Sequence, residues 1–258
     1  MTGAQRASRT GAGALITGGM SDIGRATAVA LAQAGYGVAV SYRCDAPEAE
    51  AFAASLVREH GAPHAVAIGA DVRERAEVQR MVGKAWAALR HVRLLVNAAG
   101  VNRDRPFLEM SDDEWVEVRS TILDGTFHCC QEFARRFDGD RGGCIVNIGA
   151  VTALKGRKNG ANYCAARAGV VTLTKCLALE LAPRIRVITV TPGMIDTREV
   201  RARYGLDVAD NRAQWEASIP LGRMGRPGDV AAMIEFLARP HCYITGQNYF
   251  VDGGYFTH

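Results

Sequence analysis

The sequence contains no long hydrophobic run and no large excess of charge, and both absences exclude classes of protein. No apolar stretch approaches the roughly 18 residues that a membrane-spanning helix needs. The opening MTGAQRASRTGAG is polar and lacks the apolar core of a secretory signal. The net charge of +4 is too small and too dispersed to indicate nucleic acid binding. We therefore expect a cytoplasmic chain that binds neither a membrane nor nucleic acid.

The seven cysteines include no CxxC pair, so the sequence lacks the usual signature of a zinc site. Cys129 and Cys130 are adjacent, which is too close for ordinary zinc-ligand spacing. We expect reduced thiols in the core or at the surface, and no metal site.

What the sequence does contain is a regular alternation of short apolar runs with longer amphipathic segments, over a chain of 258 residues. Continuous apolar runs are typical of strands buried on both faces, and apolar spacings of three and four are typical of helices. We predict an α/β fold, with residues 1–12 as a flexible tail and 13–258 as one Rossmann-like domain. Its doubly wound, seven-stranded parallel sheet would carry helices on both faces. The predicted strands are GALITGG, GVAVSY, HAVAIGAD, VRLLVNAAG, CIVNIGAV, IRVITVTPG and QNYFVDGG.

A glycine-rich turn, TGGMSDIGRA, follows the first predicted strand. Gly18 and Gly24 permit a tight turn into a helix that begins near Ile23, whose N-terminus would face a pyrophosphate. A plain strand-to-helix turn is the alternative. We expect Asp22 to cap this helix and to bring a carboxylate near the phosphates, at a cost of about 1–4 kcal/mol if unscreened.

The end of the second predicted strand carries Tyr42 and Arg43. An acid at this point usually binds the ribose hydroxyls of NAD, whereas a cation suits the 2′-phosphate of NADP. We therefore predict NADP(H) in preference to NAD(H). The alternative is that Arg43 is an ordinary solvated loop residue.

These motifs occur in a familiar order: TGGMSDIG, ADV, NAAG, LDGTF, NYCAARAG, TPGMIDT, GRPGDVA and YITGQNYFVDGGY. Over residues 12–255 the chain resembles short-chain dehydrogenases/reductases, and its pattern is nearest to that of the 3-oxoacyl-carrier-protein reductases. The resemblance implies a Rossmann-like fold, often as a homotetramer, with a dimer as the other assembly. The cofactor-binding residues predicted from the motifs and the resemblance together are Gly18, Ser21, Asp22, Ile23, Gly24, Tyr42, Arg43, Asp71, Val72, Asn97, Ala98, Gly100, Tyr163, Arg167, Pro192, Gly193, Ile195 and Thr197.

The resemblance also implies four catalytic positions, of which only one holds the usual residue. The family tyrosine, which transfers the proton, matches Tyr163. The usual serine, lysine and asparagine positions hold Ala150, Arg167 and Ile122. The mechanism of the family therefore cannot be transferred whole, and a partly buried structural tyrosine is the alternative for Tyr163.

Two residues are predicted to replace lost functions. Arg167 lies four residues after Tyr163 on a predicted helix, so both share a face, and its guanidinium can contact ribose hydroxyls. The missing hydroxyl at Ala150 would cost about 100–1000-fold in rate. Thr152 is the predicted substitute, and Asn147 and Asn159 are weaker candidates.

Residues 197–218 are predicted to form a helical lid over the substrate. Two basic clusters, one of Arg198, Arg201 and Arg203 and one of Lys155, Arg157 and Lys158, would border the entrance. They would attract an anionic substrate or a phosphopantetheine-bearing carrier, unless they are ordinary solvated charges.

We thus predict an NADP(H)-dependent ketoreductase of altered mechanism. Its substrate would be a small-molecule ketone such as a 3-oxoacyl or polyketide-like compound, free or bound to a carrier protein. One alternative is a non-redox cyclase, dehydratase or epimerase on the same fold. The other is a catalytically inactive binding subunit.

Overall fold

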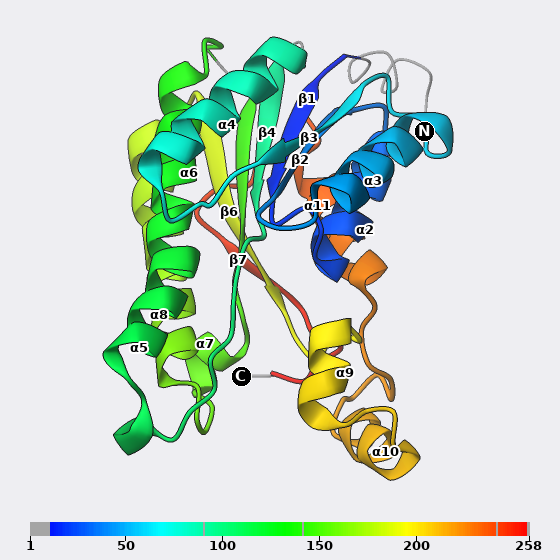
Figure 1. Cartoon of the computed structure of the whole chain (residues 1–258), viewed down its shortest axis with the longest axis vertical. Coiled ribbons are helices and arrows are strands. Elements are labelled where there is room, and N and C mark those ends of the chain that lie inside the picture. The colour runs from blue at the N-terminus through cyan, green and yellow to red at the C-terminus, as the bar shows by residue number, and fades with distance from the viewer. Residues whose placement is uncertain (1–10, 90, 141, 241, 257–258) are drawn as a thin grey trace.

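The computed structural model describes residues 11–89, 91–140, 142–240 and 242–256. Within them, seven parallel strands form one sheet in the order β3-β2-β1-β4-β5-β6-β7 (Figure 1). The order reverses between β1 and β4, and in such sheets ligands bind beyond the carboxyl ends of the strands at this point. The predicted doubly wound sheet is confirmed. The strands are β1 Gly13–Thr17, β2 Gly37–Tyr42, β3 Ala65–Gly69, β4 Val92–Asn97, β5 Gly143–Ile148, β6 Ile185–Pro192 and β7 Asn248–Val251.

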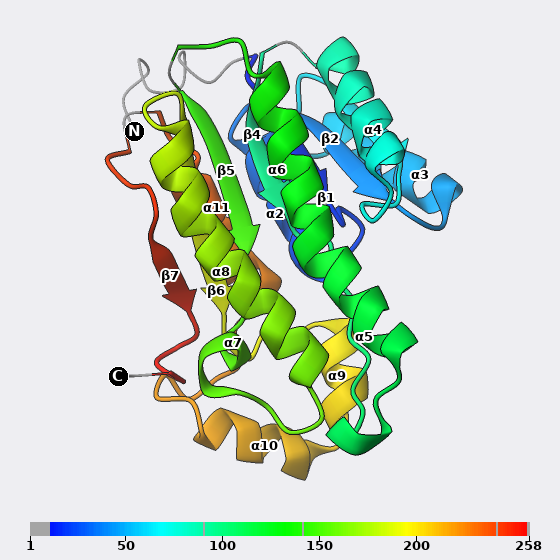
Figure 2. The same cartoon turned by 90° about the vertical axis from the view of Figure 1, so that its left-hand side faces the viewer.

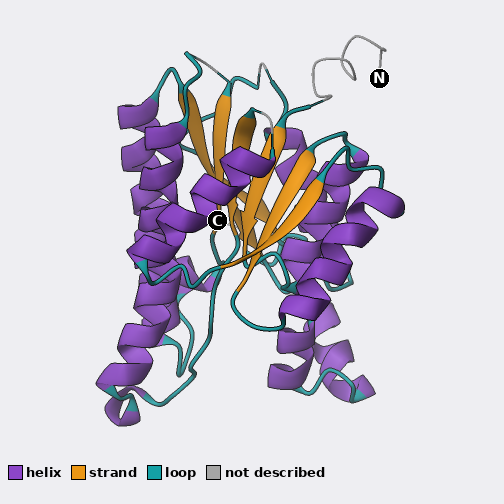
Figure 3. Cartoon of the chain, turned by 45° about the horizontal axis from the view of Figure 1, so that its top comes forward, coloured by secondary structure: helices purple, strands orange, loops and turns teal. Residues whose placement is uncertain are grey.

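Two layers of helices cover the two faces of the sheet (Figure 3). Alternate residues of a strand point to opposite faces, so Ile16 packs into one apolar cluster and Leu15 into the other. This explains why the strands are apolar without alternation. One layer contains α2 Asp22–Gln33, α3 Ala46–Arg58 and α11 Pro227–Leu237; the other, in front in Figure 2, contains α4 Arg75–Ala88, α6 Gly125–Arg136 and α8 Ala161–Leu181.

Short helices gather beyond the carboxyl ends of the strands, at the bottom of Figures 1 and 2. The predicted lid segment 197–218 is helical and contains two of them, α9 and α10. The short elements are the 3₁₀ turn η1 Phe107–Glu109, α5 Asp112–Arg119, the π turn η2 Ser120–Asp124, α7 Thr152–Lys155, α9 Arg198–Tyr204 and α10 Ala209–Ala217.

Several expectations about composition can be compared with the structure. All seven cysteines are free, and burial raises the pKa of the Cys130 thiol to about 12 and of the Cys144 thiol to about 11. In the described part of the chain, no helix has the length and apolar character required to span a bilayer. Nor do the described residues bring three or more His, Cys, Asp or Glu side chains together as metal ligands. Of the predicted tail, residues 1–10 lie outside the described residues.

A buried chain of polar side chains joins the centre of the sheet to α8. Asn97 Nδ2 on β4 donates to Asn147 Oδ1 on β5 (2.8 Å), and Asn147 Nδ2 donates to Thr174 Oγ1 on α8 (2.9 Å). Thr189 on β6 also donates its hydroxyl to Thr174 Oγ1 (2.9 Å). All four side chains are at most 3% exposed, so each bond is made away from water.

Replacing Asn147 with Ala should destabilise the protein by about 2–3 kcal/mol, because the buried Asn97 amide and the Thr174 hydroxyl each lose a hydrogen-bond partner. The matched control is Thr189→Val, which keeps the side-chain shape and leaves Thr174 bonded to Asn147, and should cost less than about 1 kcal/mol. Urea unfolding at a fixed protein concentration measures both. Equal losses for the two variants would contradict this account of the network.

Candidate active site

A cleft of about 540 Å³ lies beyond the carboxyl ends of the strands, bordered on one side by α9. It contains the predicted catalytic residues and part of the predicted cofactor set. The predicted residues that border it are Ser21, Asp22, Ile23, Ala98, Gly100, Thr152, Tyr163, Arg167, Pro192, Gly193, Ile195 and Thr197. The predicted residues outside its lining are Gly18, Gly24, Tyr42, Arg43, Asp71, Val72 and Asn97.

The glycine-rich turn is closed by its own backbone and by Ser21. The Ser21 hydroxyl donates to Gly18 O (2.8 Å) and accepts from Gly24 N (3.1 Å), so Ser21 is the cap of α2. Gly18 has a left-handed φ of +60°, and a Cβ there would lie 2.7 Å from Ala99 Cα. A Cβ on Gly24 would lie 2.3 Å from Gly18 O. The turn therefore accepts only glycine at these two points and brings the N-terminus of α2 to the edge of the cleft.

The prediction that Asp22 caps this helix is wrong, because α2 begins one residue earlier than expected and Asp22 is its first residue. The Asp22 carboxylate instead accepts from the backbone N of Arg198 (2.6 Å) and from its Nε (2.8 Å). The charge expected near the phosphates is thus compensated by a cation from the first turn of α9.

At the ends of β2 and β3, Asp71 is engaged by a residue that the sequence analysis missed. Arg73 Nε lies 3.0 and 2.9 Å from the two carboxylate oxygens, and Arg73 Nη2 lies 2.5 Å from Oδ2. These hydrogen bonds hold the pKa of Asp71 below its ordinary value, and the charge of Arg43 acts in the same direction. Arg43 itself is exposed, and the Tyr42 ring lies against Gly69.

Three asparagines of the sequence analysis do not reach the cleft with their side chains. Asn97 and Asn147 are engaged in the buried network, so only the backbone of Asn97 is available to a nucleotide. Asn159 is on an exposed loop with a left-handed φ of 63°. Of the three candidates for the missing hydroxyl, Thr152 is therefore the one that borders the cleft.

The predicted catalytic residues converge from α7 and α8. Arg167 Cζ lies 5.3 Å from the centre of the Tyr163 ring, and Arg167 Nη1 donates to Ile148 O at the end of β5 (2.6 Å). Arg167 is 6% exposed and its Nε is buried without a hydrogen-bond partner. Thr152 Oγ1 is also buried and unpartnered. Arg157, which also borders the cleft, has a buried, unpartnered Nε as well. Three unsatisfied buried polar atoms on the border of one cleft indicate a place where a ligand or water supplies the missing partners.

Ala150 and Ile122, which occupy the predicted serine and asparagine positions, have different surroundings. Ala150 borders the cleft and is 8% exposed. Ile122 is fully buried in the π turn η2 and packs in one apolar cluster with Val118, Ala166 and Tyr163. Apolar atoms therefore occupy the side of Tyr163 from which the usual asparagine would supply a polar link.

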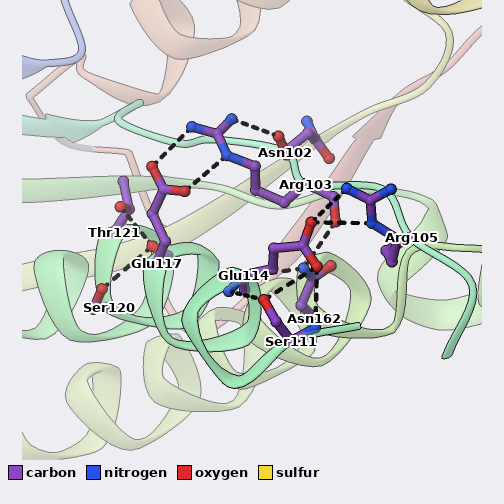
Figure 4. Close-up of polar contacts among 9 residues, drawn as sticks. All are labelled: Asn102, Arg103, Arg105, Ser111, Glu114, Glu117, Ser120, Thr121 and Asn162. Atoms are coloured by element: carbon purple, nitrogen blue, oxygen red, sulfur yellow. Dashed lines mark hydrogen bonds and ion pairs between the residues drawn. The ribbon is translucent and has the colours of Figure 1, made fainter. Parts of the chain in front are cut away.

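Asn162, immediately before Tyr163, fastens α8 to the loop that follows β4 (Figure 4). It is 1% exposed; its Nδ2 donates to Arg103 O (3.0 Å) and to Glu114 O (3.3 Å), and its Oδ1 accepts from Tyr163 N (2.7 Å). Figure 4 also shows Arg103 paired with Glu117 and Arg105 with Glu114, which hold the same loop against α5. The start of α8, which carries Tyr163, is thus held at a defined position.

The arginines of the two predicted basic clusters are paired with carboxylates. Arg198 and Arg201 are also largely exposed, which fits the alternative of ordinary solvated charges. Arg198 pairs with Asp22 and Arg201 with Asp196. Arg203 pairs with both Asp104 (3.0 Å) and Glu199.

Arg157 is 14% exposed and lies inside the site. It donates to both oxygens of Asp104 (2.9 and 2.6 Å) and to Asn102 (3.1 Å), and its Cζ lies 5.3 Å from the centre of the Tyr163 ring. Burial alone would lower the pKa of Arg157, but the neighbouring Tyr204 phenol and the charge of Asp104 outweigh burial and raise it. The sequence showed the cation but not its partners, which come from other elements.

Three aromatic residues that sequence reasoning missed complete the border of the cleft. They are Tyr204 of α9, Trp215 of α10 and Tyr255 of the segment after β7. Lys155 Nζ lies 3.7 Å from the centre of the Tyr255 ring. The sequence signals were the place of Tyr204 and Trp215 in the predicted lid and of Tyr255 at the end of the motif YITGQNYFVDGGY.

With the geometry in hand, comparison with known proteins gives a consistent result. A family model described as Enoyl-(Acyl carrier protein) reductase matches residues 18–256. The 3-oxoacyl-(acyl-carrier-protein) reductase of Staphylococcus epidermidis is 37% identical over 243 residues, which cover 93% of this chain and 97% of the relative. The protein of the same name from Synechocystis is 37% identical over 246 residues, with 93% and 95% covered.

Solved structures agree. A short-chain dehydrogenase/reductase from Brucella melitensis superposes with a TM-score of 0.88 at 30% identity, covering 97% of this chain and 98% of that one. One from Serratia marcescens gives 0.86 at 32%, with 95% and 98% covered. The resemblance predicted from the motifs is confirmed, and the chain belongs to the short-chain dehydrogenase/reductase family.

Proposed function

We propose that the protein is an NADP(H)-dependent ketoreductase in which Tyr163, Arg167 and Thr152 form an altered catalytic set. The observation that carries the proposal is the buried, unpartnered hydroxyl of Thr152 on the border of the cleft that Tyr163 and Arg167 also line. A hydroxyl in that state requires a hydrogen-bond partner, and a substrate carbonyl oxygen provides one.

The residues at the other end of the cleft fit a dinucleotide. The glycines of the first turn leave no space for side chains, and the first turn of α2 offers backbone amides to a phosphate. The buried, unpartnered Arg167 Nε is a donor available to a ribose hydroxyl. When bound, the reduced nicotinamide supplies the hydride.

The choice of NADP(H) rests on the charges at the ends of β2 and β3. The charge of Arg43 acts on the Asp71 carboxylate, which Arg73 already occupies. Arg43 itself is exposed, and its guanidinium makes no hydrogen bond or ion pair with the described residues. A 2′-phosphate matches the charge of Arg43 better than a ribose hydroxyl does.

In the proposed reaction, each of the three residues has one task. Tyr163 holds a proton on its phenol oxygen and transfers it to the carbonyl oxygen, while hydride reaches the carbonyl carbon and an alcohol forms. Thr152 donates a hydrogen bond to the same oxygen, where negative charge develops. Arg167 keeps a fixed cation beside the phenol ring, since arginine stays charged at all working pH values.

Tyr163→Phe should lower kcat at least about 100-fold, because general acid catalysis typically contributes that much or more. NADPH binding, followed by fluorescence titration, should remain. Tyr243→Phe is the control, since that ring is fully exposed. Unchanged turnover of ketone by the Tyr163 variant would remove this residue from the mechanism.

Thr152→Val should lower kcat about 100-fold, because it removes one donor to the developing charge, whereas Thr152→Ser should stay near the parent value. Ala150→Ser restores a hydroxyl on the border of the cleft and should raise kcat. Steady-state kinetics on the three variants test this assignment. If the Val and Ser variants at position 152 behave alike, the Thr152 hydroxyl has no role.

Arg43→Ala should weaken NADPH binding about tenfold or more, the loss expected for a hydrogen bond to a charged group, and leave NADH binding unchanged. Arg80→Ala, at an exposed position on α4, is the matched control. Equal effects on both coenzymes would contradict the assignment of the 2′-phosphate to Arg43.

A further inference from the structure

Tyr204, Trp215 and Tyr255 form one continuous surface of the cleft, which we call the aromatic wall. The ring centres of Tyr204 and Trp215 lie 4.8 Å apart, and those of Trp215 and Tyr255 lie 6.3 Å apart, both at an interplanar angle of 62°. In Figure 1 the C-terminal segment that carries Tyr255 runs toward α9, so residues distant in sequence meet here.

The arginines next to the aromatic wall add no net charge to it. Arg157 and Arg203 share Asp104, and Arg203 also pairs with Glu199, so two cations face two carboxylates. Gly160 leaves space for this arrangement, because a Cβ there would lie 2.8 Å from Arg157 Nε. These pairs tie α9 to the loop after β4. Lys155, the other cation at the wall, lies with its Nζ 3.7 Å from the centre of the Tyr255 ring and is engaged by that aromatic face.

Arg157 also connects the aromatic wall to the catalytic tyrosine. Its guanidinium lies against the Tyr163 ring, and the Tyr204 phenol is close enough to raise the pKa of Arg157. The first ring of the wall is therefore one side chain away from the group that is proposed to protonate the carbonyl. A substituent attached close to the reacting carbonyl would meet aromatic surface.

From these contacts we infer that the substrate is a ketone with a flat aromatic substituent, which packs against the aromatic wall. Aromatic rings gain from offset and edge contacts in addition to the area they bury, and the compensated arginines offer no comparable attraction to an anionic group. This inference rests on the proposed reductase function and specifies its substrate class.

The aromatic wall has a structural role as well, which the experiment has to separate. Tyr204 and Trp215 pack with Leu206, Ile219 and Met224 in the small apolar core of the lid segment. A substitution at Trp215 therefore changes the lid for every substrate. The ratio of the kcat/KM values for two substrates, measured on the same variant, cancels that common effect.

The experiment compares ethyl 3-oxo-3-phenylpropanoate with ethyl 3-oxobutanoate at saturating NADPH. We expect the parent protein to favour the phenyl compound about 10–100-fold in kcat/KM, the range for an apolar group in a matching pocket. Trp215→Leu should reduce this ratio to within about threefold of unity. Trp115→Leu, a partly exposed tryptophan on α5 outside the cleft lining, should leave the ratio unchanged.

An acetoacetyl thioester of N-acetylcysteamine serves as a mimic of a carrier-bound acyl group. A higher kcat/KM for this thioester or for the methyl compound would overturn the inference while the reductase function stands. A preference for the phenyl compound that remains in Trp215→Leu would also overturn the inference.

Calorimetric titration of the phenyl compound into the protein with NADP⁺ keeps the two proposals distinguishable. The parent protein could bind the phenyl compound without reducing it, while Trp215→Leu does not bind it. That result would overturn the reductase function and support the aromatic wall as the ring site. No binding of the phenyl compound would overturn the inference.

Discussion

The hydrogen bond from Asn147 on β5 to Thr174 on α8 sets the rotation of the helix on which the site depends. Arg167 lies seven residues before Thr174, which is about two turns, so both side chains face the sheet. Arg167 accordingly reaches the carbonyl of Ile148 at the end of the same strand. Tyr163, one further turn toward the N-terminus, then extends past the sheet into the cleft. A polar core contact thus determines where the proposed catalytic side chains lie.

Ion pairs hold the other side of the cleft. Arg198, the first residue of α9, is hydrogen-bonded to Asp22 at the glycine-rich turn. Arg203, the penultimate residue of α9, pairs with Asp104 in the loop after β4. Both ends of this helix are therefore linked to the body of the protein, one on the proposed cofactor side and one on the proposed substrate side. Exposed pairs contribute little to stability, so their main effect here is on the position of the helix.

The apolar residues at the predicted serine and asparagine positions, Ala150 and Ile122, differ in their surroundings. Ala150 lies on the border of the cleft, and so does Thr152, whose buried hydroxyl has no hydrogen-bond partner. Ile122, in contrast, is part of an apolar cluster that includes Tyr163.

The sequence by itself determined the features that depend on short windows of chain: the seven strands, the glycine-rich turn, the helical lid segment, and the shared helix face of Tyr163 and Arg167. Periodicity and turn chemistry are local, and right-handed connections between parallel strands place helices on both faces of the sheet. Only the tertiary structure decided that Ser21 and not Asp22 caps α2, that Asn147 is buried, that Arg157 pairs with Asp104, and that Tyr255 joins Trp215. The position of the cap depends on a shift of one residue at a helix end, and the other three features depend on which distant residues the fold brings together. Local sequence carries no signal for such a shift or for such contacts.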